Sequence, residues 1–146
     1  MLISKVRKYI ADSITSVDSD FRQHRDAFND ENIASTNINK SFHIAYSIPS
    51  IASDQATFNN SVTAEIKFFF KGQRDTIETF DNAMDTVSQI SMKLASLTNI
   101  AAFRSTDMLP IQTCVPVSQV PEQLNNNDNS LIITLSLEMN IVQSSC

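Results

Sequence analysis

Two segments of the chain alternate between apolar and polar residues, and they constrain the fold more than any other feature. Apolar residues occupy every second position from Val62 to Phe70 and again from Leu131 to Ile141. A period of two places those side chains on one face of a β-strand. The segment Phe42 to Ile48 alternates in the same way, and Pro49 is expected to end that strand. Together these segments predict an antiparallel sheet with one buried face.

Two amphipathic helices are predicted beside these strands. The first has an apolar stripe from Ile3 to Val17 at spacings of three and four residues. The second is expected to run from Asp75 to Ser96, with Asp75 as its N-cap and acidic residues opposite its apolar stripe. The residues of that stripe are Ile77, Phe80, Met84, Val87, Ile90, Leu94 and Leu97.

A weaker alternation from Ile111 to Val117 is interrupted by prolines, which are typical of an edge strand. An Asn/Asp-rich turn, residues 123–130, leads from it to the last strand. The expected fold class is therefore α+β: a mainly antiparallel four-stranded sheet with two helices packed on it, in the order α-β-β-α-β-β. We expect residues 1–146 to form a single domain of this kind.

Two long polar segments are expected to be loops. They cover Asp18–Asn39 and Ser50–Asn60, and a loop of such length in a compact domain is usually functional or ordered by a partner. The only glycine of the chain, Gly72, lies between the second alternating strand and the second helix. It is predicted to adopt positive φ where the chain turns from one to the other.

A single glycine in 146 residues also limits the chemistry that the chain can perform. Phosphate-binding loops, nucleophile elbows and dinucleotide-binding turns all require glycine. The histidines, His24 and His43, lie near no serine or cysteine motif, and Cys114 and Cys146 are too few for a four-ligand metal site. We therefore expect no catalytic residue, no cofactor and no metal. The net charge of −5 disfavours nucleic-acid binding.

The long hairpin that ends in Thr63–Phe70 and runs into an acidic amphipathic helix resembles the tail terminator (tail completion) proteins of long-tailed bacteriophages, of the lambda minor tail protein U type. The N-terminal helix, the long loop before the first strand and the final strand after an Asn/Asp turn fit the same plan. The resemblance implies a structural virion protein without enzymatic activity, assembled in the host cytoplasm and located at the head-proximal end of the tail.

The resemblance also implies a set of partners. Such a protein forms a homo-oligomeric ring, hexameric in this family, that caps the tail tube and ends its polymerisation. It joins the tail to the head-completion, or neck, proteins. DNA passes through the lumen only as cargo, and no membrane is involved.

Residues in the polar loops and on the outward faces are the expected interface residues. They are Phe28, Ile51, Asp54, Phe58, Phe69, Asp81 and Asp85. Phe69 belongs here because an alternating strand places it opposite Phe68 and Phe70, either beneath a helix or against another subunit.

Three alternative functions stay open at this point. The chain could be a different neck or head-completion subunit, or a tail-tube-like subunit. It could be a non-enzymatic adaptor that binds one bacterial partner through its loops. An enzyme that uses His43, or the carboxylates of Asp81 and Asp85, is the remaining alternative.

Overall fold

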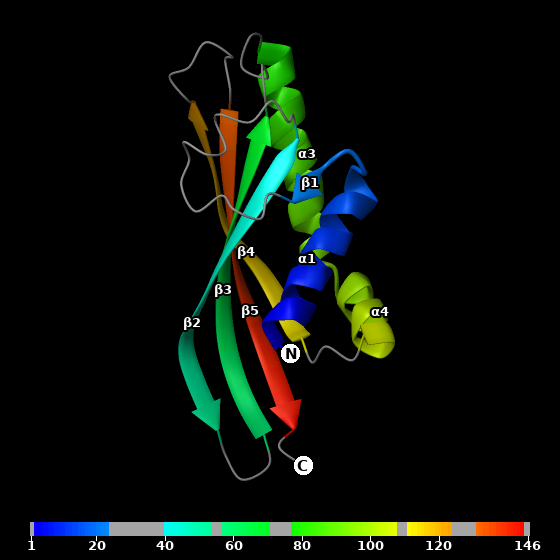
Figure 1. The fold of residues 1–146 in the computed structure, drawn as a ribbon, viewed down its shortest axis with the longest axis vertical. Coiled ribbons are helices and arrows are strands. Elements are labelled where there is room, and N and C mark those ends of the chain that lie inside the picture. The colour runs from blue at the N-terminus through cyan, green and yellow to red at the C-terminus, as the bar shows by residue number, and fades with distance from the viewer. Residues whose placement is uncertain are drawn as a thin grey trace.

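The computed structural model of the chain describes residues 2–23, 40–53, 57–70, 77–107, 111–123 and 131–144. These ranges contain three helices and five strands (Figure 1). The helices are α1 (Leu2–Val17), α3 (Ile77–Ala95) and α4 (Leu97–Asp107). The strands are β1 (Arg22–Gln23), β2 (Ser41–Ser53), β3 (Thr57–Phe70), β4 (Ile111–Gln123) and β5 (Leu131–Ser144).

The five strands form one mixed sheet in the order β1-β2-β3-β5-β4. The pairs β2–β3, β3–β5 and β4–β5 are antiparallel, whereas β1 pairs with β2 in parallel. The expected four-stranded sheet with two helices and the order α-β-β-α-β-β is therefore wrong. Sequence periodicity missed the short strand β1 and the helix α4. It found the four long strands but made β2, β3 and β4 too short.

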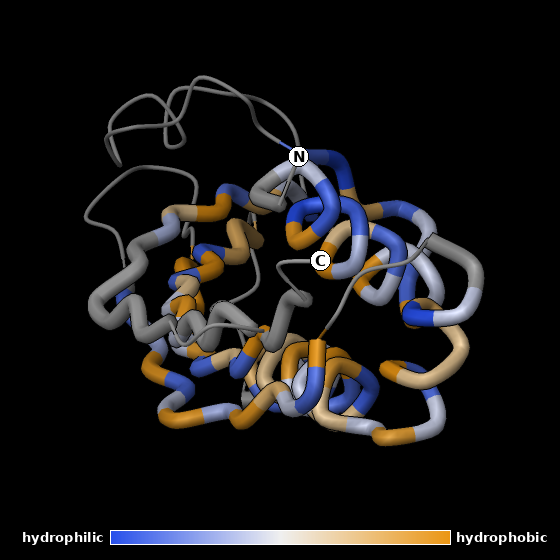
Figure 2. The backbone as a smooth tube through the Cα atoms, turned by 90° about the horizontal axis from the view of Figure 1, so that it is seen from below, coloured by the Kyte–Doolittle hydropathy of each residue, from blue (hydrophilic) through white to orange (hydrophobic). Residues whose placement is uncertain are grey.

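All three helices lie on one side of the sheet, which we call the inner face (Figure 1). The core is formed by the alternating residues of β3 and β5 together with the apolar stripes of α1 and α3. Ile66 and Leu135 are a cross-strand pair at its centre and are both fully buried. This confirms the predicted buried face of the strands. Figure 2 shows hydrophobic and hydrophilic residues alternating along the backbone of the sheet.

An aromatic cluster fixes the start of β1 against the sheet. The ring of Phe21 meets those of Phe42, Phe68 and Phe70 edge to face, with centroid distances of 6.5, 5.6 and 5.7 Å. The Arg22 N–H donates to the Lys40 carbonyl at 2.9 Å. A two-residue strand cannot stabilise itself, so these tertiary contacts explain why no local sequence pattern revealed β1.

A hydrogen-bonded group of side chains joins the three helices. The Tyr9 hydroxyl of α1 donates to the Leu94 carbonyl at the end of α3, and the Asn99 amide of α4 donates to Tyr9 at 3.2 Å and to Ser13 at 3.1 Å. Tyr9 is 1% exposed and Ser13 is 4% exposed. Because these buried polar atoms satisfy one another, the helices can pack closely without an unpaired donor.

The second helix ends earlier than predicted. The structure breaks the helical run at Ser96 and starts α4 at Leu97. The Ser96 hydroxyl accepts a hydrogen bond from the Asn99 N–H at 3.3 Å, which is the geometry of an N-cap. Leu97 is 70% exposed and does not continue the apolar stripe. By contrast Val87, Ile90 and Leu94 are fully buried, as predicted.

The strand β2 does not stop at Pro49. It continues to Ser53, and β3 begins at Thr57, so most of the expected loop Ser50–Asn60 is strand. The pairing of β2 with β3 shifts in register between Ser47 and Ser50. The strand accommodates the missing proline N–H by this irregularity instead of ending there. The hairpin and the end of β5 extend beyond the helices (Figure 1).

Some predictions fall outside the described residues. These include the turn at Gly72, the N-cap at Asp75, most of the loop Asp18–Asn39 and the turn over residues 124–130. Asp18, at the start of the loop Asp18–Asn39, forms an ion pair of 2.8 Å with Lys40, which follows the end of that loop and has a φ of 59°.

Candidate interaction surface

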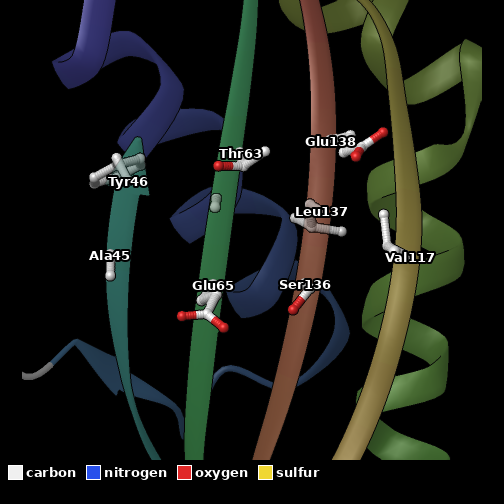
Figure 3. A pocket seen from close by; sticks show the side chains of 9 residues that line it. Ala45, Tyr46, Thr63, Glu65, Val117, Ser136, Leu137 and Glu138 are labelled. Atoms are coloured by element: carbon white, nitrogen blue, oxygen red, sulfur yellow. The ribbon is translucent and has the colours of Figure 1, made fainter. Parts of the chain in front are cut away.

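The side of the sheet away from the helices, which we call the outer face, carries a hollow of about 340 Å³ (Figure 3). Its lining comes from four neighbouring strands: Ala45 of β2, Thr63 and Glu65 of β3, Ser136 and Glu138 of β5, and Val117 of β4 are among its residues. In Figure 3 the helices lie behind the strands, and the Glu65 and Ser136 side chains point away from them. The hollow is therefore part of the outer face.

Strand register explains why carboxylates meet in this hollow. Glu65 is paired with Ser136 and Thr63 with Glu138, so the two glutamates are diagonal neighbours on adjacent strands. Both glutamates are exposed. The hollow thus offers two solvated carboxylates beside small and apolar side chains, a combination that suits a cationic or mixed protein surface.

Two bulges in β4 determine which of its residues reach the outer face. The pairing of β4 with β5 shifts between Ile111 and Thr113 and again between Pro116 and Ser118. As a result Cys114 is buried, whereas Val115, Val117 and Val120 are 53%, 58% and 55% exposed. An irregular strand with prolines at the edge of a sheet confirms the predicted edge strand.

The side-chain amide of Gln119 joins β4 to α3. The Gln119 side chain donates to the Met84 carbonyl of α3 at 3.0 Å and accepts from the Ser88 hydroxyl at 3.3 Å. Gln119 is paired with Leu135, whose side chain belongs to the core. These contacts fix the inner side of β4 and thereby direct its valines outward.

The titratable groups of the interior are shielded from solvent. Burial raises the pKa of the Cys114 thiol to about 12. Burial also raises the pKa of Tyr9 to about 12, against the opposing effect of its hydrogen bonds with Asn99 and Ser13. A thiol with a raised pKa is a poor nucleophile and a poor metal ligand. Within the described part of the chain, no three His, Cys, Asp or Glu residues are grouped so that they could hold a metal ion.

The side chains of three predicted interface residues are described: Phe69 lies on β3, whereas Asp81 and Asp85 lie on α3. Asp81 and Asp85 are exposed on α3, while Phe69 is 1% exposed and is paired with Ile132, which is fully buried. That pair lies on the outer side of its strands, yet Phe69 has almost no area left for a neighbouring subunit. The backbones of Ile51 and Phe58 belong to β2 and β3. Phe28 and Asp54 lie outside the described residues.

The residues named for the enzyme alternative lie on two different elements. His43 lies on β2, paired with Lys67, whereas Asp81 and Asp85 lie on the solvent side of α3. Sequence reasoning missed the outward valines of β4, because a simple alternation from Ile111 assigned Val115 and Val117 to the same face as Ile111. The closely spaced prolines were the available signal that this alternation breaks.

Each helix in the described part of the chain is too short or too polar to cross a membrane. No family model matches the sequence, and no curated protein matches it. Among solved structures, the fold is similar to a chain of a structure described as "Virion of native gene transfer agent (GTA) particle". The TM-score is 0.64 at 7% identity, over 97% of this chain and 98% of the other. At this identity the similarity establishes a shared fold.

Proposed function

We propose that the chain is a structural subunit of a phage-like virion, and specifically a tail terminator that forms a ring on the tail tube. In this role it ends tube polymerisation and offers its opposite side to head-completion proteins. We further propose that it has no enzymatic activity, because its work is done by contacts between surfaces.

The observation that carries this proposal is the similarity in fold to a chain of a gene transfer agent virion, over nearly the full length of both chains. It supports a virion component, and it agrees with the resemblance of the element pattern to phage tail terminators. An accidental likeness of one supersecondary unit would cover only part of each chain. We infer the specific role of tail terminator from the fold similarity and the element-pattern resemblance taken together.

The shape of the molecule supports an assembling role. One side of the sheet is covered by helices, while the hollow on the outer face is lined by exposed side chains such as Glu65 and Val117. The hairpin of β2 and β3 extends past the helical layer (Figure 1). Ring subunits need such extended strands and open faces to contact their neighbours and the next ring.

Electron microscopy of the purified full-length chain tests the proposal. Closed rings of uniform size are expected, together with a light-scattering mass that is a fixed multiple of 16.3 kDa. When the chain is added to growing tail tubes of its own particle, tube length should stop increasing. Rings should be visible at one tube end.

Other results would indicate a different function. Long tubes formed by the chain alone would identify a tube-like subunit instead of a terminator. Rings that bind capsids but leave tube growth unchanged would favour a neck or head-completion subunit. A monomer that enters no particle would contradict the virion role altogether.

A further inference from the structure

Five large apolar side chains are exposed among the described residues, and they fall into two clusters. Val115, Val117 and Val120 form one cluster on the outer face of β4. Met92 and Leu97, at 72% and 70% exposure, form the other where α3 meets α4. Apolar area concentrated in this way usually marks a contact with another macromolecule.

The two clusters have opposite electrostatic surroundings. The outer face carries Glu65, Glu122 and Glu138 with one lysine, Lys67, all placed there by strand register. Around the α3–α4 junction the exposed cations are Lys93, Arg104 and Lys8.

Lys8 belongs to this corner because its Nζ lies 5.9 Å from the centre of the Phe103 ring of α4. The described acid one turn further along α1 is Asp12. Among the residues named here, the outer face is mainly acidic and the α3–α4 corner is mainly cationic. Such complementarity favours correct association and its orientation.

A single chain cannot bring these surfaces together. Register with β5 places Val115 and Val120 on the outer face, and Val117 lines its hollow. Met92 and Leu97 are exposed on α3 and α4, and the helices cover the inner face (Figure 1). The sheet lies between them. Two different surfaces that complement each other across copies give a head-to-tail contact, which closes into a ring when the rotation between copies allows it.

We propose that the outer face of β4, with its neighbouring hollow, receives the α3–α4 corner of a second copy of this chain. In this contact Leu97 packs against Val117, and cations of the corner face Glu65 and Glu138. The proposal rests on the proposed function in that it gives the ring its subunit interface. It assigns the contact to surfaces other than the segment Ser50–Asn60.

Cysteine cross-linking tests this contact. Val117→Cys and Leu97→Cys are made separately in a Cys146→Ser background, and Cys114 is protected because it is only 4% exposed. The two variants are mixed at equal amounts, allowed to exchange subunits and oxidised. We expect disulfide-linked dimers of Val117→Cys with Leu97→Cys at least tenfold above those of either variant alone.

A matched control and a double variant sharpen the test. Asp81→Cys is also exposed on α3 but lies about three turns before Met92, so its mixture with Val117→Cys should give little cross-linking. The double variant Val117→Cys/Leu97→Cys should give a ladder of linked species that ends at the ring size. Unchanged thermal unfolding of each reduced variant confirms that the fold is intact.

The outcomes separate the contact from the function. If wild-type rings form but the mixture links no better than the Asp81→Cys control, the contact is wrong while the tail terminator role stands. If the pair links efficiently but the ladder continues without an end, the contact is right and the closed ring is wrong. Linking of Val117→Cys to itself, or a chain that stays monomeric, also overturns the head-to-tail contact.

Discussion

The inner and outer faces of the sheet are built from the same strands, but they serve different purposes. On the inner face, alternate residues of β3 and β5 such as Ile66 and Leu135 are closed off by three helices. On the outer face, the intervening residues Glu65 and Glu138 border an open hollow. The comparison teaches that burial within the subunit determines the first face, whereas in the proposed contact the second face receives another copy of the chain.

The largest expected effect comes from removing a side chain of the inner face. Phe68 is fully buried and its ring contacts Phe21 and Phe42. Phe68→Ala should lower the free energy of unfolding by about 3–5 kcal/mol, because it leaves a cavity in the aromatic cluster. Urea titration followed by circular dichroism measures this. Glu65→Ala, three residues earlier and outward, is the control and should change stability by less than about 0.5 kcal/mol. Equal losses would contradict the contrast between the faces.

A smaller loss of stability is expected when the hydrogen bonds that join the three helices are removed. Tyr9→Phe removes the hydroxyl that donates to Leu94 and accepts from Asn99. The Leu94 carbonyl and the Asn99 amide each lose this hydrogen-bond partner. We therefore expect the free energy of unfolding to fall by about 1–3 kcal/mol. Asn99→Ala should cost a similar amount, and the double variant should cost clearly less than the sum. Strict additivity in denaturant unfolding would show that the two residues are not coupled.

The dependence of stability on alkaline pH tests whether the side chains of Cys114 and Tyr9 are shielded from solvent. Burial raises the pKa of Cys114 and of Tyr9 to about 12, so both groups keep their protons in the folded chain at pH values where the unfolded chain loses them. The contribution of these two groups to stability should therefore be constant below about pH 8.5, the ordinary thiol pKa, and fall as the pH rises toward 12. Cys114→Val should make the fall shallower. An unchanged slope in that variant would argue that the thiol is solvated.

The smallest effect is expected at the margin of the fold, where Asp18 and Lys40 pair. Burial alone would raise the pKa of Asp18, but the hydrogen bonds from Lys40 and from the Asp20 N–H, together with the charge of Lys40, outweigh it and lower the pKa. The contribution of this pair is thus present above about pH 4 and is lost as the pH falls through the lowered pKa. Asp18→Asn should cost about 0.2–1 kcal/mol at neutral pH. Thermal melts at pH 7 and pH 3 should differ less in this variant than in the wild type, with the exposed Asp20→Asn as control.

Periodicity predicted the inner face because burial imposes a regular pattern on the sequence. The stripe of α1 and the alternation of β3 and β5 were all found where expected. Periodicity failed to predict the elements whose structure depends on tertiary contacts. The two residues of β1 depend on the Phe21 cluster and on Lys40. Among the α4 side chains whose burial is described, Ile100 alone is fully buried, which is too little to produce a stripe.

The interaction surface was harder to predict than the core. Bulges at Gln112 and Val117 reverse the phase of β4, and a bulge is visible only once β5 is in register beside it. The extension of β2 past Pro49 also depends on strand pairing, because the register of β2 with β3 shifts at the proline. Outward residues are also free of the packing constraint that makes inward residues regular. Their role therefore has to be derived from exposure and charge.

The most direct test of the contrast between the faces is the light-scattering mass of Val117→Glu beside its thermal stability. Val117 is 58% exposed, so the charge should leave the melting temperature unchanged. In the proposed contact the same charge adds to Glu65 and Glu138 and faces Leu97 of the next copy, so the oligomer should dissociate to 16.3 kDa monomers. Asn82→Glu, an exposed position on α3, should keep the wild-type mass. A Val117→Glu variant that stays fully oligomeric, or that unfolds, would contradict the account.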